Sequence, residues 1–212
     1  MQKSLLRLCV VAALMISLVG SADAAKSDAC RLDENGVSCT TNLPCPAVIE
    51  RNEHKTDLFD VEYPRICGMS DTSVQERINA VLQQRVDAFI TQVSQAAEDG
   101  KNYPAGARFT GKMEYQVHRQ DAELLSLTLQ TYQFTGGAHG SSSLAGYTFN
   151  LSTGQLLKYV DLFNFDDASR QSLNENIIAQ IRARQIPIFE PYGGVSDDPA
   201  FYLKADNKVV IV

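Results

Sequence analysis

Tryptophan is absent from this chain of 212 residues, histidine occurs three times, and basic residues are in the minority. Lys and Arg number 19 against 25 Asp and Glu, which gives a formal charge of −6 at pH 7. Nucleic-acid binding requires clustered basic side chains that neutralise phosphates, so we expect no nucleic-acid partner. His54, His118 and His139 are isolated, without a His-x-His or His-Glu-x-x-His pair. We therefore expect neither a metal site nor a cofactor.

Long hydrophobic runs are also scarce. The one present, Leu8–Val19, is shorter than the roughly 20 apolar residues that a transmembrane helix needs. Lys3 and Arg7 precede it, and Ala22–Ala24 offers the small-x-small pattern of a cleavage site. An uncleaved anchor is the alternative, but this pattern favours a signal peptide over residues 1–24 and a secreted or periplasmic mature chain without a membrane span. Two cations and one acid leave with the signal, so the net charge falls from −6 to −7.

Cysteine is confined to the first third of the chain: one lies in the signal, and the other four are Cys30, Cys39, Cys45 and Cys67. An even number of cysteines in an exported chain predicts two disulfides. A zinc site is the alternative, but the spacing includes no Cys-x-x-Cys and no neighbouring histidine pair. Disulfides are therefore favoured, and four cysteines allow three pairings.

The strands expected around the last two cysteines favour one pairing. Residues 46–55 and 57–66 have the pattern of two strands that meet near Lys55–Thr56. In a hairpin centred there, Cys45 lies opposite Cys67 at the open end, within bridging distance. The pairs that we predict are Cys45–Cys67 and Cys30–Cys39.

Two helices are indicated by apolar residues that recur at every third or fourth position. The first follows Ser70 or Asp71, either of which can cap it, and ends near Gly100. The second follows Asp166 or Asp167. The apolar positions are Val74, Ile78, Leu82, Val86, Phe89 and Val93 in the first helix, and Leu173, Ile177, Ile178 and Ile181 in the second.

Strands account for most of the remaining pattern. Residues 109–117, 125–132 and 144–151 alternate apolar and polar side chains, and a further short strand is expected over 155–159. A hairpin around Asp206–Asn207 ends the chain. This order of elements predicts an α+β fold, a mostly antiparallel sheet with two helices packed on it.

Five strings of residues carry a family resemblance. The most specific is Tyr132-x-Phe134-Thr135-Gly136-Gly137-Ala138-His139-Gly140, and the others are Tyr63-Pro64-x-Ile66-x-Gly68, Val74-x-x-x-Ile78-Asn79, Tyr147–Gly154 and Asp161-Leu162-Phe163. Together they resemble the RsiV-like family, the paired domains of unknown function that form the extracytoplasmic part of the RsiV anti-sigma factor. The first of these domains is also similar to the non-catalytic N-terminal domain of the peptidoglycan deacetylase PdaC.

The resemblance covers residues 46–212 and implies two domains. A PdaC N-terminal-like domain spans 46–140 and an RsiV C-terminal-like domain spans 141–212, after a disulfide-tied lead-in over 25–45. The sigma-binding segment and transmembrane helix of RsiV-like proteins and the esterase domain of PdaC have no counterpart in this sequence, so neither activity is carried over. RsiV-like proteins continue past the last hairpin into another strand, which implies either that the second domain is incomplete at Val212 or that the chain is a fragment.

The glycine-rich string Gly136, Gly137, Ala138, His139 and Gly140 is the candidate binding site. His139 with one of the following serines could be a base and a nucleophile, but neighbouring residues of an extended segment face opposite sides. A Gly-x-Ser-x-Gly elbow and an orienting acid are also missing. A turn whose imidazole bonds the backbone is therefore favoured, and no catalytic residue is predicted.

The resemblance, the missing catalytic domain and the acidic charge indicate a non-enzymatic, exported binding or sensor domain of the cell envelope. The partner implied is a cationic lysozyme-like wall hydrolase, because lysozyme is the known extracellular ligand of RsiV-like proteins, or peptidoglycan itself. Specific contact is expected at the loop Gly136–Gly140, with Asp197 and Asp198 adding attraction at the rim. The alternative is a cell-wall glycan hydrolase, or a module associated with a deacetylase, with His139 in its site.

Overall fold

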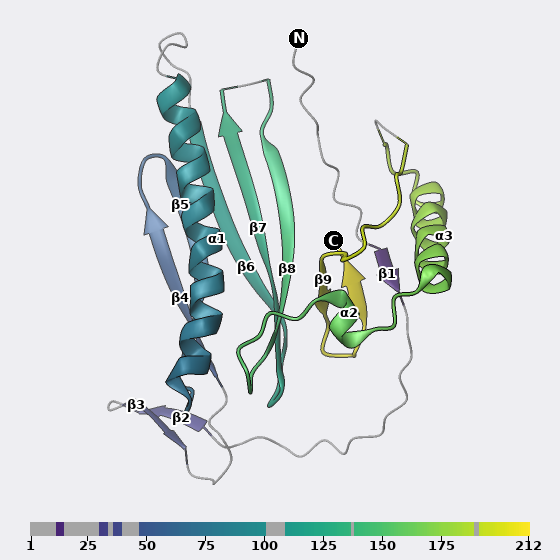
Figure 1. The fold of residues 1–212 in the computed structure, drawn as a ribbon. Coiled ribbons are helices and arrows are strands. Elements are labelled where there is room, and N and C mark those ends of the chain that lie inside the picture. The colour runs from purple at the N-terminus through teal and green to yellow at the C-terminus, as the bar shows by residue number, and fades with distance from the viewer. Residues whose placement is uncertain are drawn as a thin grey trace.

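The computed structural model describes residues 47–100, 109–136, 138–188 and 191–212, and the backbone of three short strands nearer the N-terminus. Figure 1 shows a five-stranded sheet with one long helix along it, and a small three-stranded sheet with a second helix beyond the last strand. No helix in these parts of the chain is long and apolar enough to cross a membrane.

The large sheet begins with a hairpin of β4 (Val48–Lys55) and β5 (Phe59–Cys67). Thr56 fixes its turn, because the Thr56 hydroxyl accepts bonds from the N–H groups of Leu58 and Phe59 at 3.2 and 3.1 Å. The Thr56 N–H in turn donates to the Phe59 carbonyl at 2.9 Å. The turn is therefore centred later in the chain than the sequence predicts.

This register bears on the predicted Cys45–Cys67 bridge. Val48, three positions beyond Cys45, is the residue opposite Cys67, so the predicted hairpin register is wrong. Cys67 is a partly buried free thiol, and burial raises its pKa. Cys45 lies outside the described residues, so the bridge itself stays a prediction.

Backbone pairing is described for three segments of the N-terminal part. β2 (Cys30–Asp33) and β3 (Gly36–Cys39) form a hairpin whose first and last residues, both cysteines, lie opposite each other. β1 (Ala12–Leu14), which falls within the predicted signal, pairs with the C-terminal strand β10 (Val209–Ile211). The second bridge and the cleavage of the signal both stay predictions.

Helix α1 (Thr72–Asp99) packs against one face of the large sheet. Asp71 caps it as predicted, since its carboxylate accepts two backbone N–H bonds of the first turn at 2.9 and 3.2 Å. The buried residues of the helix are those that its periodicity predicts: Val74, Ile78, Leu82, Val86, Phe89 and Val93.

The other three strands form an antiparallel meander of β6 (Phe109–Gln120), β7 (Leu124–Thr135) and β8 (Ser141–Asn150). β6 joins β5 in parallel over only three residue pairs. We call these three parallel pairs the β5–β6 seam. Beyond the seam, Asn79 of α1 bonds the backbone of Ile66 in β5. Its side chain accepts from the Ile66 N–H and donates to the Ile66 carbonyl, both at 2.8 Å. A helix side chain thus replaces the missing strand partner.

Strand β7 shows the predicted alternation. Its leucines Leu125, Leu127 and Leu129 are buried in the core under α1. The intervening residues face the other side of the sheet, and two of them, Ser126 and Thr128, are buried as well. Strand β9 of the small sheet contacts β6, β7 and β8 and covers that side.

The C-terminal part builds a second, smaller core. It consists of α2 (Tyr159–Leu162), α3 (Asp167–Ala183) and β9 (Phe201–Leu203), which pairs with β10. Asp166 caps α3 by accepting the Ser169 N–H at 2.8 Å, as one of the two predicted caps. The core residues are Tyr159, Leu173, Ile177, Ile181, Phe201, Leu203, Val209 and Ile211.

One predicted element differs. Residues 155–159 form no strand; Leu156 makes a single bridge to Phe149, and α2 follows directly after Lys158. The Asp161 carboxylate accepts the Lys158 N–H at 2.8 Å and holds the chain in this short helix. The α+β fold with a mostly antiparallel sheet is confirmed, and α2 is an additional helix.

Candidate ligand-binding pocket

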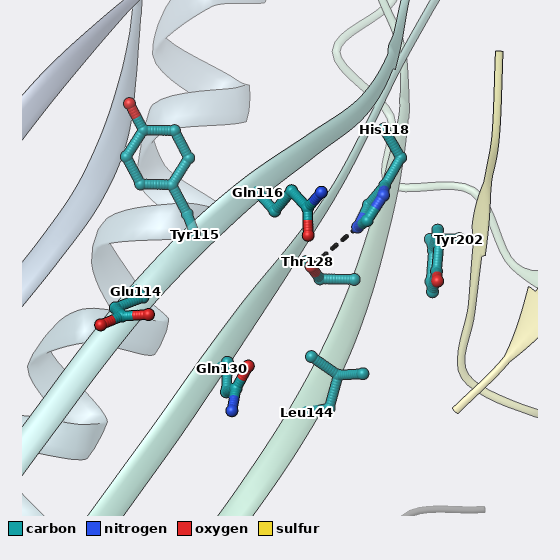
Figure 2. A pocket seen from close by; sticks show the side chains of 8 residues that line it. All are labelled: Glu114, Tyr115, Gln116, His118, Thr128, Gln130, Leu144 and Tyr202. Carbon is teal, nitrogen blue, oxygen red and sulfur yellow. Dashed lines mark hydrogen bonds between the residues drawn. The ribbon is translucent and has the colours of Figure 1, made fainter. Parts of the chain in front are cut away.

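Two rows of side chains cross the large sheet on the face opposite α1. Successive residues of a strand alternate between faces, so residues paired across β6, β7 and β8 point to the same side. Figure 2 shows most of them, with His118 and Tyr202, around a pocket of about 320 Å³. The rows are Gln116–Thr128–Gly146 and Glu114–Gln130–Leu144.

His118 lies two residues beyond Gln116, on the same face of β6, and is part of a β-bulge. The β6–β7 ladder shifts register between Val117 and Arg119, which leaves His118 as the extra residue. Its Nε2 lies 2.9 Å from the Thr128 hydroxyl oxygen, and its ring stacks on Tyr202 with the ring centroids 4.0 Å apart. The imidazole thus lies against Tyr202 of the covering strand β9.

The surroundings of His118 favour the neutral imidazole at pH 7. Burial lowers the pKa of His118, and the positive charge of Lys204 lowers it further. Neutral imidazole has one donor and one acceptor nitrogen, either of which can pair with the Thr128 hydroxyl. Glu114 is then the one formally charged side chain that lines the pocket.

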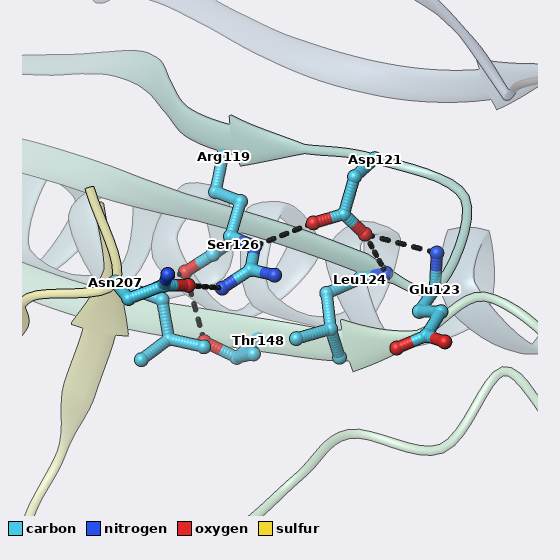
Figure 3. Close-up of polar contacts among 8 residues, drawn as sticks. Arg119, Asp121, Glu123, Leu124, Ser126, Thr148 and Asn207 are labelled. Carbon is cyan, nitrogen blue, oxygen red and sulfur yellow. Dashed lines mark hydrogen bonds and ion pairs between the residues drawn. The ribbon is translucent and has the colours of Figure 1, made fainter. Parts of the chain in front are cut away.

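Strand β9 can lie on the sheet because small residues stand beneath it. A Cβ atom added to Gly146 would lie 2.1 Å from the carbonyl oxygen of Phe201. Beside it, the Ser126 hydroxyl accepts the Leu203 N–H at 2.8 Å and lies 2.8 Å from the Thr148 hydroxyl (Figure 3). The sheet therefore offers β9 both space and a hydrogen-bond partner.

The tip of the β9–β10 hairpin is anchored near the end of β6 (Figure 3). Arg119 places its Nε 2.6 Å from an Asp121 carboxylate oxygen and donates from Nη1 to the Asn207 side-chain oxygen at 2.7 Å. Asp121 also accepts the N–H groups of Glu123 and Leu124 at 2.9 and 2.8 Å. Burial by itself would raise the pKa of Asp121, but these bonds and the Arg119 charge outweigh it and lower the pKa.

Three pocket side chains keep free hydrogen-bonding groups. Within the described chain, no group bonds the Glu114 carboxylate or the carboxamides of Gln116 and Gln130. His118 is the candidate base of the pocket, and the hydroxyl beside it is that of Thr128, a residue only 4% exposed. Among the described residues, no carboxylate orients His118. The pocket offers groups for binding without a complete catalytic set.

The predicted binding loop lies at a different place, the turn between β7 and β8. Gly136 has a φ of +82°, and exposed His139 has its Nδ1 3.2 Å from the Gly140 carbonyl oxygen. Ser141–Ser143 are exposed at the start of β8, and no bond among described residues joins them to His139. Gly137 lies outside the described residues. The imidazole contacts the backbone, as a turn predicts, while the binding role of the loop stays a prediction.

The pocket residues carry little signal in the sequence and were not predicted from it. Of the three histidines, the fold brings His118 into a pocket, while His54 lies 5.5 Å from the Phe59 ring. Across the described ranges, no three His, Cys, Asp or Glu residues gather where they could hold a metal ion. One signal was available: Gly146 within a strand pattern indicates that another backbone approaches closely.

Comparison with known families concerns the region from β4 to the start of β8. Residues 50–142 match the family described as deacetylase PdaC. This part of the chain is similar to that family, and we call residues 50–142 the PdaC-like domain. The predicted resemblance to PdaC is thereby confirmed. The PdaC-like domain contains Gln116, His118 and Gln130, whereas Tyr202 lies beyond it, so the C-terminal part completes the pocket.

Two solved structures are similar to the chain. A member of the DUF3298 family from Bacteroides fragilis is 18% identical with a TM-score of 0.50, over 77% of this chain and 81% of that chain. A DUF3298 family protein from Pseudomonas aeruginosa is 14% identical with a TM-score of 0.46, over 68% and 69%. The first likeness shows a shared fold. No curated protein matches the chain.

Proposed function

We propose that this protein is an exported, non-catalytic binding module of the cell envelope. The pocket under β9 is the observation that supports it. Polar groups of Glu114, Gln116 and Gln130 are free there, whereas His118 is bonded to a buried hydroxyl and stacked on an aromatic ring. These polar groups are exposed and can bond a ligand, whereas the engaged base has no activated nucleophile to serve.

Two observations support export and a location in the cell envelope: the N-terminal signal pattern and the match to the PdaC family. Lys3, Arg7 and the apolar run before Ala22–Ala24 have the pattern of a cleaved signal. The match to the family described as deacetylase PdaC supports a role near peptidoglycan, because the sequence resemblance is to a peptidoglycan deacetylase. In that compartment the available ligands are wall glycans and the enzymes that cut them.

The charge of the chain favours a cationic protein as one partner, such as a lysozyme-like wall hydrolase. A net charge of −7 after signal removal would speed association with a cation. Asp197 forms an ion pair with Arg170 at 2.7 Å, and its side chain is still 98% exposed to an approaching partner. Screening shortens the reach of such charges from about 10 Å at 0.1 M salt to about 3 Å at 1 M, so binding should weaken as salt rises.

Calorimetry tests this partner. The exported protein, purified folded, is titrated with several lysozymes at low and high salt. We expect heat at low salt that declines at high salt, and slower association for Asp197→Asn than for the control Glu76→Gln on α1. If no lysozyme gives heat at low salt, the proposal of a cationic lysozyme-like partner is wrong. Capture of a different protein from envelope extract would leave the binding module with another ligand.

Turnover measurements separate the binding module from the alternative, a glycan hydrolase with His139 in its site. The protein is incubated with peptidoglycan fragments and model esters, beside His139→Ala and His118→Ala. We expect no product with any of the three. Turnover that disappears in either variant would establish an enzyme and overturn the non-catalytic reading.

A further inference from the structure

The free groups of the pocket have a distinct chemical character. Gln116 and Gln130 each provide a carboxamide that can donate two hydrogen bonds and accept two, and Glu114 provides a carboxylate that accepts. These three side chains lie side by side on β6 and β7, and none is bonded within the described chain. A ligand with several hydroxyl or amide groups would satisfy both the donors and the acceptors.

The charge of the pocket excludes two other ligand classes. An anion would need cationic donors, but the lining has none, since His118 is neutral and its Nε2 is engaged with Thr128. A divalent cation needs several oxygen or nitrogen ligands of suitable charge, and Glu114 is the single carboxylate. A neutral polar molecule is the class that remains.

The walls and the volume of the pocket indicate which kind of neutral polar molecule would fit. Leu144 gives an apolar wall beside Gln130, and the stacked pair of His118 and Tyr202 closes the pocket on the side of β9 (Figure 2). The volume of about 320 Å³ lies at the lower end of the range for small-molecule sites, roughly 300–1,000 Å³. An apolar wall facing polar groups suits a compact ring with C–H groups on its face and hydroxyls around its edge.

We propose that this pocket binds a neutral sugar residue of a glycan. Gln116 and Gln130 bond its hydroxyl or acetamido groups, Glu114 accepts from a hydroxyl, and Leu144 contacts the ring. The proposal rests on the function proposed above and names a ligand class for that binding module. Because Tyr202 comes from β9, the site exists only when the PdaC-like domain and the C-terminal hairpin are packed together.

The test is an NMR titration of the folded chain with triacetylchitotriose and with cellotriose, two β-1,4-linked trisaccharides that differ in the acetamido group. We expect shifts at the pocket residues with at least one sugar, and affinity at least tenfold weaker in the double variant Gln116→Leu/Gln130→Leu. Gln84→Leu, an exposed position of α1, is the matched control and should bind as the unaltered chain does. Dispersed spectra of the variants show that they fold.

Each outcome has a defined meaning. Absence of pocket shifts with both sugars at millimolar concentration, shifts away from the pocket, or equal binding by the double variant would overturn the proposal. Binding of inorganic phosphate or Ca²⁺ at these residues would overturn the neutral-ligand assignment. If the protein captures an envelope partner but binds no sugar, the proposed binding module stands and the sugar proposal is wrong. If it hydrolyses a bound sugar, the sugar proposal stands and the non-catalytic function is wrong.

Discussion

At the scale of single residues, Gly146 decides whether β9 can lie on the sheet. In Gly146→Ala the new Cβ would stand 2.1 Å from the Phe201 carbonyl, which cannot retreat without moving β9. We expect a loss of about 1–3 kcal/mol in the free energy of unfolding, measured by urea denaturation with circular dichroism. Gly193→Ala is the control, because no atom lies within 4 Å of a Cβ at that position. Equal stability of the two variants would contradict the close approach.

His118 should make stability depend on pH. Its pKa in the folded chain is lower than the ordinary value of 6.5, so the unfolded chain takes up the proton first as the pH falls. The stabilising contribution is complete above that ordinary value and is lost as the pH falls through the lowered pKa of the folded state. Denaturation between about pH 7 and 5 should show this decline, and His118→Asn should flatten it. An unchanged slope in the variant would assign the decline to other groups.

At the scale of elements, the β9–β10 hairpin should be held to β6 through its tip. Arg119 bonds Asn207, which has a φ of +60°, so Asn207→Gly removes the side chain without straining the turn. A double-mutant cycle with Arg119→Ala should give a coupling of about 0.5–1 kcal/mol, modest because the bond is exposed. Additive effects of the two changes would show that the hairpin is held by its buried residues alone.

The helices and most strands were predictable because their signals are local. The apolar spacing from Val74 to Val93 and the Asp71 cap depend on neighbours within one or two turns. The first hairpin was predicted with the wrong register, because the Thr56 hydroxyl bonds two backbone N–H groups and moves the turn. Residues 155–159 were ambiguous for a similar reason, since a short apolar segment fits either a strand or a helix start.

At the scale of the whole molecule, the pocket could not be predicted because it is made by distant segments. The bond from the Leu203 N–H to the Ser126 hydroxyl joins residues 77 positions apart. In the sequence, Ser126, Thr128 and Gln130 have the alternation of a solvated strand face, and only the packing of β9 shows that two of them are buried. The site therefore depends on tertiary contacts that periodicity does not encode.

The redox state should affect the whole molecule. If the four cysteines of the exported chain form two bridges, native protein has no reactive thiol, and reduction lowers the free energy of unfolding by about 2–5 kcal/mol for each bridge. Thiol counting before and after denaturation, with melting in the presence and absence of reductant, measures both effects. Four reactive thiols in native exported protein would contradict the bridges, and peptide mapping would decide between the three pairings.

The parallel seam between β5 and β6 sets an order for folding. The hairpin β4–β5 and the meander β6–β8 pair strands that are neighbours in the chain, and such local contacts close quickly. The seam, by contrast, joins strands on either side of the 28-residue helix α1, and has only three residue pairs to offset that loop closure. We therefore expect the two halves to form first, and the docking of α1 across them to be the slow step of folding.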